Sequence, residues 1–425
     1  MKKKTSVILI ALAAMCMVFA ATEPVVRYDD IDFTFRPASA RFEGMGESGT
    51  ASAGRLDSLF HNPASLADSG FAIRIPSVSL TVFNISANAS DENVMADIDS
   101  IRNGSADNST YVDLLQRYVS HLGSGHNLIS QVDISAALKV WHIGIGSDIQ
   151  VKIHSLNRGS ASLANVAVIP EVNAAETLAL GFKFIDTDLL SLSIGGAGHL
   201  VVKEYYRGIS ANKISSLITE EGADIQKMMI WDTPVMAGYA LPFDLGATIG
   251  LGKSFGVSAT VTNLNGTYHM KSYTSEGDFL IAEGRQAQID IPMPEGHVTN
   301  DSMEFEIETP WELNFGVSFA PDWKVLRPVV SADLVDMAGM VRDIRNGNFR
   351  AEDLLLHLNA GAEISIAEIL RVRAGVNRGY VSVGAGINLL IMQVDASYGW
   401  REMGSQIGDK PVDALTIRLN IGYDR

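Results

Sequence analysis

The feature that most constrains this chain is an alternation of apolar and polar residues with a period of two, which recurs in separate segments from residue 71 onward. In the last segment an apolar row alternates with a polar row: Leu415, Ile417, Leu419, Ile421 and Tyr423 against Thr416, Arg418, Asn420 and Gly422. Successive side chains of a β-strand point to opposite faces of a sheet, so the pattern predicts a strand with one apolar face. Beyond residue 21 no run of about 18 apolar residues occurs, so any membrane must be crossed by strands rather than by helices.

Six further segments show the same alternation: 143–153, 178–184, 311–319, 354–360, 370–375 and 381–389. Some neighbouring segments are separated by short turn signals such as Pro321-Asp322 and Asn377-Arg378-Gly379. Others are separated by long polar connections at 86–127, 208–233, 272–302 and 401–411. Short turns that alternate with long loops are typical of outer membrane barrels, and the spacing predicts about 14 antiparallel strands, within two.

Such strands suit either a soluble sandwich or a closed barrel in a membrane, and three observations favour the barrel. Charged residues occupy the polar face of several strands, as expected of a wet lumen, and the candidate lumen-lining residues are Asp148, Lys152, Glu363, Arg371, Arg373 and Arg418. Aromatic residues near strand ends, among them Trp141, Tyr205, Trp323 and Trp400, are expected at the membrane interfaces. The chain also ends in a strand, which can close on the first one and remove both exposed edges.

We therefore predict an all-β fold, a single transmembrane antiparallel β-barrel over residues 70–425 with partly helical extracellular loops. The helical parts are expected at 110–122 and 214–229, where apolar residues recur at intervals of three and four. A short helix that packs on the barrel mouth is one interpretation of each segment. A surface that docks a partner protein or rests on lipid is the other.

The N-terminus predicts export from the cell. Three lysines precede an apolar run from Val7 to Phe19 and the small residues Ala20 and Ala21, so residues 1–21 are expected to be a secretory signal peptide. Without those lysines the formal charge of -16 becomes -19, which argues against a nucleic-acid partner. The one cysteine, Cys16, lies within this peptide, so the mature chain is expected to contain neither disulfides nor thiolate metal sites.

Residues 22–69 carry the motifs of a family resemblance. The stretches 40–46 (ARFEGMG), 50–53 (TASA) and 60–67 (FHNPASLA) resemble the start of FadL-type outer membrane barrels, the long-chain fatty acid transporters and their relatives. Weaker similarity continues at 261–266 and 331–336, and at 361–363 followed by 373–377. The resemblance implies that residues 22–69 form a hatch, or plug, inside the lumen. The hatch and gate candidates are Arg41, Gly44, Gly46, Asn62, Pro63 and Ala64.

The resemblance implies a transporter or channel for hydrophobic or amphipathic small molecules such as long-chain fatty acids, located in the outer membrane of a diderm bacterium. The alternative is a non-transport barrel that serves as a structural, secretion-accessory or adhesive surface protein. The charged inward set, without an obvious apolar lining, departs from the fatty acid transporters. Expected partners are outer membrane lipids, a hydrophobic small-molecule ligand and the barrel assembly machinery, whereas the cargo and the oligomeric state are not specified.

No motif indicates an enzyme or a cofactor. Gly44, Gly46 and Gly49 match a dinucleotide fingerprint in spacing, but the strand and helix that must flank it are not predicted. Gly246, Gly250, Gly252 and Gly256 lack the end of a phosphate loop and are interpreted as inward strand glycines that make room for the hatch. His154 and Ser155 are neighbours, but neighbours on a strand point to opposite faces. The histidines show no metal-binding spacing.

The inward arginines leave two interpretations open. Arg371, Arg373 and Arg418 could line an anion path if their strands lie close together. They could instead form ion pairs with Glu363, Asp395 or acidic residues of the hatch, which would keep buried charges satisfied.

Overall fold

The computed structural model describes residues 34–424, apart from 53, 55, 159–162, 164, 212–214, 216–224, 290, 300–301, 348 and 404–406. The predicted signal peptide, residues 1–21, and the first part of the predicted hatch, residues 22–33, lie outside the described residues.

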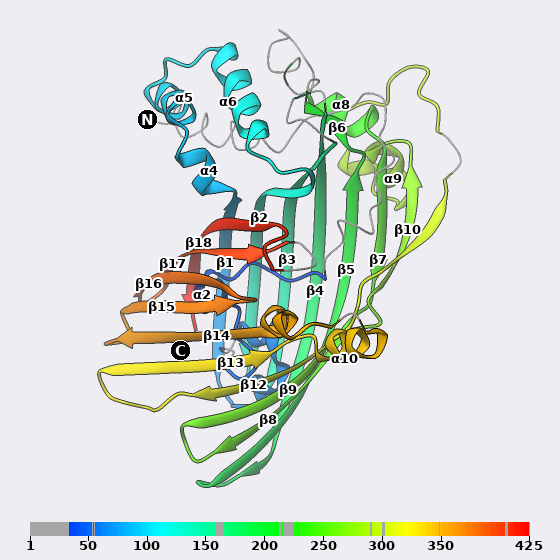
Figure 1. Ribbon diagram of the computed structural model, residues 1–425. Helices are drawn as coiled ribbons and strands as arrows, with labels where there is room; N and C mark the ends of the chain where they lie inside the picture. The colour runs from blue at the N-terminus through cyan, green and yellow to red at the C-terminus, as the bar shows by residue number, and fades with distance from the viewer. Residues whose placement is uncertain are drawn as a thin grey trace.

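The described strand segments form one antiparallel sheet that closes into a barrel (Figure 1). The first half of the sheet comprises β1 (Phe71–Phe83), β2 (Gly125–Val140), β3 (Ile143–Asn157), β4 (Val166–Asp186), β5 (Leu190–Tyr206), β6 (Ile209–Ser210), β7 (Val235–Ala240), β8 (Phe243–Leu251) and β9 (Phe255–Leu264). The second half comprises β10 (Thr267–Tyr273), β11 (Glu304–Glu308), β12 (Glu312–Phe319), β13 (Leu326–Leu334), β14 (Leu358–Ile366), β15 (Leu370–Asn377), β16 (Tyr380–Leu389), β17 (Met392–Glu402) and β18 (Pro411–Tyr423).

The barrel has 14 strands, because several segments are parts of one strand. β7 and β8 both pair with β5 and run in the same direction, β9 and β10 follow them as the next strand, and β11 and β12 form the one after. These three neighbouring strands are interrupted at Leu241-Pro242, Asn265-Gly266 and residues 309–311. The two-residue β6 continues β5 and pairs with β4, and β1 pairs with β18 to close the ring. The predicted antiparallel barrel of about 14 strands is confirmed.

The outer face of the wall is apolar and the inner face is polar. In β18, Ile417, Leu419 and Ile421 are exposed on the outside, while Thr416 and Asn420 are buried inside. Inner residues of β1 and β18 form hydrogen bonds with one another where these two strands close the barrel. The hydroxyl of Thr81 lies 2.8 Å from that of Thr416, and Ser77 donates to Asn420. An outer face of this kind suits lipid, because every backbone group of a closed barrel is paired within the sheet.

The two rims of the barrel differ. One rim carries short turns, and we call it the short-turn rim; the opposite one, the long-loop rim, carries α4 (Ile85–Ala89), α5 (Glu92–Asn103), α6 (Asn108–Ser120), α8 (Ile225–Trp231), α9 (Glu276–Ala282), η3 (Gln286–Gln288), α10 (Met337–Asn346) and η4 (Ala351–His357) (Figure 1). No helix among the described residues is long and apolar enough to cross a membrane. The segment predicted at 110–122 is α6, whereas part of the one predicted at 214–229 lies outside the described residues.

Local sequence signals fix where the loop helices begin. Asp91 caps α5 by accepting hydrogen bonds from the backbone N–H groups of Asn93 and Val94. Asp107 caps α6 through the N–H of Thr110, whose hydroxyl accepts from the N–H of Asp107 in return. These caps satisfy amide groups that the first turn of a helix leaves without partners.

The loop between β13 and β14 corrects one strand prediction. Residues 354–360 alternate in polarity, but Leu354 and Leu356 lie in the 3-10 helix η4 and the strand begins at Leu358. The sequence 351–357 contains three consecutive leucines, so its apolar residues fit a helical turn as well as a strand.

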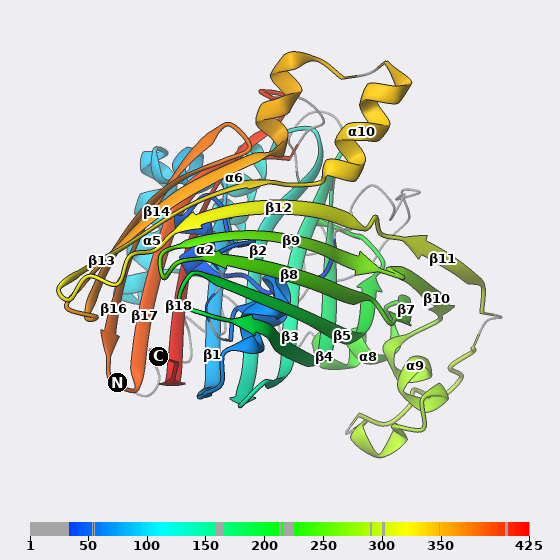
Figure 2. The same ribbon diagram turned by 90° about the horizontal axis from the view of Figure 1, so that it is seen from below.

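Residues 34–69, which we call the luminal segment, lie inside the barrel. The segment contains α2 (Ala40–Gly44), α3 (Ser58–His61) and the 3-10 helix η2 (Pro63–Ala67). Phe42, Met45, Leu59 and Leu66 are fully or almost fully buried. Figure 2 shows α2 enclosed by the ring of strands.

Candidate functional site

The turn at Asn62-Pro63-Ala64 is held against the wall by hydrogen bonds and by glycines. The Asn62 side chain accepts from the N–H of Ala64 at 3.0 Å and donates to Thr50 O at 2.8 Å and to Thr248 Oγ1 at 3.1 Å. A Cβ atom on Gly246 would lie 2.1 Å from Asn62 Oδ1. The turn therefore fits only because the facing wall position has no side chain.

The other hatch candidates are also placed against wall glycines. Gly44 approaches Gly384 so closely that a Cβ on Gly44 would lie 3.0 Å from the Cα of Gly384. Gly46 has a φ of +63° and donates its N–H to the hydroxyl of Ser382 at 3.1 Å. A left-handed φ at this close approach requires glycine.

The interpretation of the four glycines of β8 and β9 needs correction. Gly246 does make room for the luminal segment, and a Cβ on Gly256 would meet Ser318 Oγ at 2.8 Å and Ala51 O at 3.8 Å. A Cβ on Gly250 would instead meet Ser191 of the neighbouring strand. Gly252 lies in the turn between the two strands with a φ of +61°.

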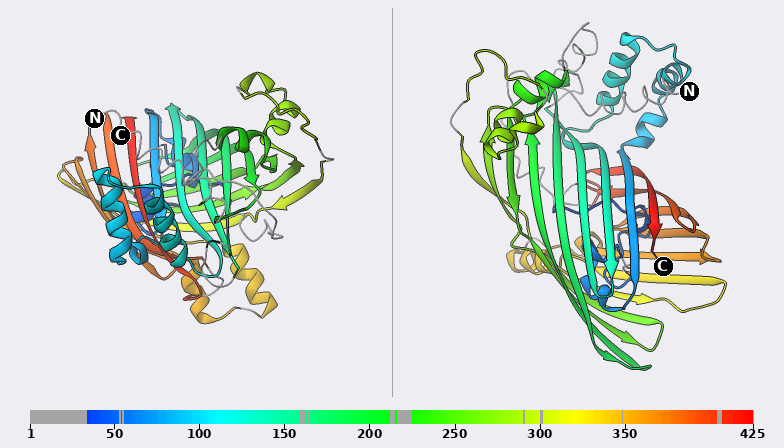
Figure 3. Two further views of the ribbon diagram at one scale, coloured as in Figure 1. Left: turned by 90° about the horizontal axis from the view of Figure 1, so that it is seen from above. Right: turned by 180° about the vertical axis from the view of Figure 1, so that it is seen from behind.

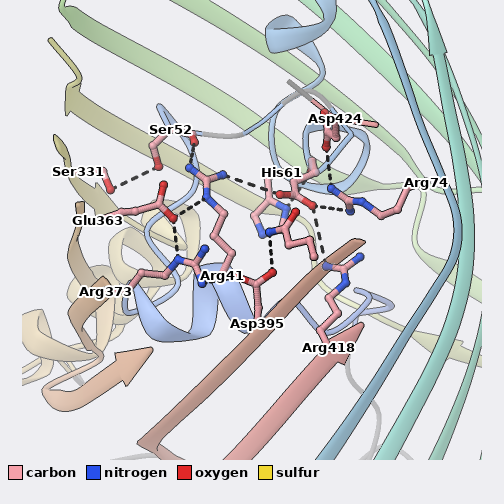
Figure 4. A network of polar contacts seen from close by, with 12 residues as sticks. Arg41, Ser52, His61, Arg74, Ser331, Glu363, Arg373, Asp395, Arg418 and Asp424 are labelled. Atoms are coloured by element: carbon pink, nitrogen blue, oxygen red, sulfur yellow. Dashed lines mark hydrogen bonds and ion pairs between the residues drawn. The ribbon is translucent and has the colours of Figure 1, made fainter. Parts of the chain in front are cut away.

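Ion pairs tie the luminal segment to the wall near the short-turn rim. The Asp57 carboxylate lies 2.9 Å from Arg74 Nη1, 3.8 Å from Arg41 Nη1 and 3.9 Å from Arg418 Nη1. Figure 4 shows these three guanidinium groups converging from the luminal segment, β1 and β18. Although burial alone would raise it, the pKa of Asp57 is held well below its ordinary value by Arg74, Arg418 and Arg41.

A second set of ion pairs adjoins the first. Arg373 bridges Glu363 and Asp395, with 2.6 Å from Nε to Glu363 Oε2 and 2.6 Å from Nη1 to Asp395 Oδ1. Arg41 reaches the same Glu363 oxygen at 3.4 Å (Figure 4). For Arg373 the structure therefore shows ion pairing, and Glu363 joins the wall to the luminal segment. Arg371 faces the same lumen and makes no ion pair with any described residue.

The remaining lumen candidates lie on β3. Asp148 and Lys152 both point inward and are buried. Lys152 Nζ lies 3.8 Å from Glu171, which also binds His154 at 2.6 Å and Lys203 Nζ at 3.4 Å. His154 thus belongs to a buried polar network in the lumen. The described residues contain no cluster of three or more His, Cys, Asp or Glu side chains that could hold a metal ion.

The structure corrects the expectation that the lumen has no apolar lining. Inward residues of β4, β5, β7, β10 and β11 pack with one residue of the luminal segment into what we call the luminal apolar cluster: Phe35, Ile169, Ala175, Val201, Tyr205, Ala240, Tyr268, Met270 and Ile307. Phe60 of the luminal segment packs against it. Tyr205 was predicted at a membrane interface, but its side chain is fully buried in this cluster.

A cation lies at the edge of the luminal apolar cluster. Lys203 Nζ is 4.6 Å from the centre of the Tyr268 ring and 5.4 Å from that of Tyr205, and it also pairs with Glu171. The cluster therefore has an apolar body and a charged, fully buried end.

Two polar cavities flank the luminal segment. One, of about 290 Å³, faces the long-loop rim and is lined by Glu47, Lys152 and Arg401 among others. The other, of about 330 Å³, faces the short-turn rim and is lined by Arg371, Asp395 and Arg418 among others. Ser39 lines both, so the luminal segment separates them there. A further cavity, of about 540 Å³, lies outside the lumen beneath α9.

Comparisons with known proteins find likeness in fold. No family model matches the sequence, and no curated protein matches it. The solved structure of the toluene transporter TodX from Pseudomonas putida aligns at 9% identity over 90% of this chain and 97% of that chain, with a TM-score of 0.44. A FadL homologue from Pseudomonas aeruginosa aligns at 11% identity over 92% and 99%, also with a TM-score of 0.44.

A more distant match is the translocator domain of the autotransporter NalP from Neisseria meningitidis, at 9% identity over 83% of this chain and 88% of that chain, with a TM-score of 0.34. These alignments each span most of this chain, and the likeness is one of overall arrangement.

Proposed function

We propose that this protein is an outer membrane transporter that carries hydrophobic or amphipathic small molecules, such as long-chain fatty acids, through its lumen. The observation that carries the proposal is the luminal apolar cluster. Lumens of outer membrane barrels are generally polar, and an inward apolar surface next to a movable plug offers such a molecule a place to bind. Phe35 and Phe60 cover this surface from the luminal segment, so a shift of the segment would uncover it.

The mechanism needs no covalent chemistry. A ligand would enter the polar cavity at the long-loop rim, replace Phe35 and Phe60 on the apolar cluster, and leave once the luminal segment has moved from the wall. The ion pairs of Asp57 and Glu363 hold the segment against the wall. Binding energy from the apolar cluster would offset their loss, which is how ligand-driven gating works in general.

One observation favours the alternative of a non-transport barrel. The luminal apolar cluster is packed, and the two cavities within the lumen are lined by polar residues on either side of the luminal segment. A structural or adhesive barrel would have such an interior permanently. The two proposals differ in whether the luminal segment moves.

Uptake by a host that lacks its own transporter tests the proposal. Met270→Gln places an amide in the luminal apolar cluster, and His269→Gln is the matched control on the outer face of the same strand. A hydrocarbon offers the amide no hydrogen-bond partner and loses an apolar contact, so Met270→Gln should lower the apparent affinity for an aliphatic or aromatic substrate. His269→Gln should leave uptake unchanged.

Folding of each variant is checked first by the heat-dependent mobility shift of intact barrels in gels. If the wild-type protein supports uptake of neither a long-chain fatty acid nor an aromatic hydrocarbon, the transporter proposal is wrong. Equal uptake by the wild type and by folded Met270→Gln would place the path elsewhere.

A further inference from the structure

The loop between β13 and β14, residues 335–357, differs from the other long loops in its surface. It consists of α10 and η4, which project beyond the outline of the barrel at the long-loop rim (Figures 2 and 3). The base of α10 is fixed: the Asp336 side chain accepts from the N–H of Gly339, and its backbone N–H donates to Asn314 of β12. The helix ends at Gly347, which has a φ of +73°.

One face of α10 is apolar and exposed. Met337, Met340, Val341 and Ile344 follow at intervals of three and four and form a single stripe along the helix. Val341 is 48% exposed and Ile344 52%. On the second arm of the loop, Leu354 is 46% exposed and Leu355 45%. This short loop therefore exposes four large apolar side chains that no other described residue covers.

The apolar residues of the other loop helices have different surroundings. In α6 and α9, Tyr118, Val119 and Phe279 are buried against the outside of the barrel wall and one another. α5 exposes Met95 and Ile98 and carries the acidic residues Glu92, Asp97 and Asp99. A negatively charged lipid surface would repel α5.

The lipid-facing wall continues to the base of this loop without a charged boundary. The outward residues of β13 and β14 pair with one another and are all apolar: Leu326, Pro328, Val330, Ala332 and Leu334 with Ile366, Ile364, Ala362, Ala360 and Leu358. The last pair, Leu334 with Leu358, directly precedes and follows the loop. The loop thus leaves the wall at the edge of its apolar band, which is where the surface of a surrounding membrane would lie.

The polar side of α10 carries Arg342, Asp343 and Arg345, a net charge of +1, and η4 adds Glu352 and Asp353 beside Arg350. Arg342 and Arg345 follow one flank of the apolar stripe, and neither makes an ion pair with a described residue. A short helix with an apolar stripe and arginines beside it is the pattern of helices that lie in a membrane interface, where the arginines reach lipid phosphates.

We propose that α10 and η4 form an interfacial foot that lies in the lipid surface beside the barrel. Val341, Ile344, Leu354 and Leu355 dip into the acyl boundary, and Arg342 and Arg345 contact the phosphates of anionic lipids. The foot fixes the height and tilt of the barrel at the long-loop rim. This inference does not depend on the proposed transport function.

Fluorescence in reconstituted vesicles tests the foot. In a chain with Cys16→Ser, one cysteine is introduced at Ile344, at Leu355, at Arg342 or at Ile98, and a polarity-sensitive fluorophore is attached to it. All four positions are exposed or at the surface, so the barrel should fold in each case, which the gel shift verifies. The barrels are inserted into vesicles of phosphatidylethanolamine and phosphatidylglycerol, with or without bromine on the acyl chains.

The proposal predicts blue-shifted emission that brominated chains quench strongly for labels at 344 and 355, and little quenching for labels at 342 and 98. Arg342→Gln with Arg345→Gln should weaken the quenching at 344 in anionic vesicles and leave it unchanged in uncharged ones. Labels at 344 and 355 as accessible to water as the label at 98 would overturn the proposal. Labels that are shielded but not quenched, to a degree that rises with the protein-to-lipid ratio, would overturn it in favour of a contact between two barrels.

Discussion

Asp57→Asn is the substitution that most sharply probes how the luminal segment is held. It keeps the size of the side chain but removes the charge that faces Arg74, Arg41 and Arg418. Arg74 retains Asp424 at 2.7 Å, and Arg41 retains Glu363, so these two guanidinium groups keep one partner each. Arg418 loses its one carboxylate among the described residues and keeps the hydroxyl of Ser77.

Removing one partner of a buried ion pair lowers the free energy of unfolding by about 3–5 kcal/mol. Because Arg74 and Arg41 each keep another carboxylate, we expect Asp57→Asn to lie near the lower end, at about 3 kcal/mol. The loss should fall on the luminal segment rather than on the wall, because the strand pairing is unchanged. We therefore expect proteases to cut within 34–69 much faster in the variant, while the gel shift of the barrel persists.

The matched control is Asp188→Asn, whose carboxylate pairs with Lys253 at 3.6 Å and is 95% exposed, so that no change is expected. Equal protection of the luminal segment in the wild type and in Asp57→Asn would refute the view that these ion pairs hold it.

Three further predictions follow from the wall and from the same carboxylate. Leu419→Arg should cost about 2–4 kcal/mol in unfolding from vesicles if Leu419 lies near the membrane midplane, and Leu419→Ala should cost much less. Gly246→Ala should release the luminal segment to proteases, because its Cβ would lie 2.1 Å from Asn62 Oδ1, whereas Gly198→Ala meets nothing within 4 Å and should be silent. The pKa of Asp57 is lower in the folded protein than in the unfolded chain, where it is about 3.9. The stability that the ionised Asp57 contributes is therefore fully present above a pH of about 3.9 and is lost as the pH falls toward the folded pKa. The wild type should thus lose protease protection of the luminal segment in acid, and Asp57→Asn should not show this acid-dependent loss.

The sequence predicted the wall of this protein well, because period two is a local signal. The outward row of β18 and the count of 14 strands both follow from it. Strands β1, β2, β5, β7 to β9, β13 and β17 were expected only through the strand count, and β10 and β11 were missed, since each is short and lies next to a break at Gly266 or Pro310, where the alternation restarts. Part of each was assigned to a polar loop or left out.

The candidate site was predicted in part. The inward position of Arg373 and Arg418 followed from alternation, but their partners did not, because pairs such as Arg418 with Asp57 join positions far apart in the chain. The luminal apolar cluster was missed for the same reason: Ile169, Val201 and Met270 come from three strands, and each alone is one apolar residue on a mixed face. The one local hint was the short apolar run Leu200-Val201-Val202 in β5, where an apolar residue falls on both faces of the strand.

For a hydrophobic molecule to pass through the lumen as proposed, the luminal segment must move. A disulfide between Ser48→Cys and Ser331→Cys, in a chain with Cys16→Ser, tests it directly, because the two hydroxyl oxygens lie 2.8 Å apart and join the luminal segment to β13. With the disulfide formed, uptake of long-chain fatty acid or aromatic hydrocarbon should stop, and a reductant should restore it to the level of the single variants. Uptake that is the same in the oxidised and reduced barrels would contradict the account.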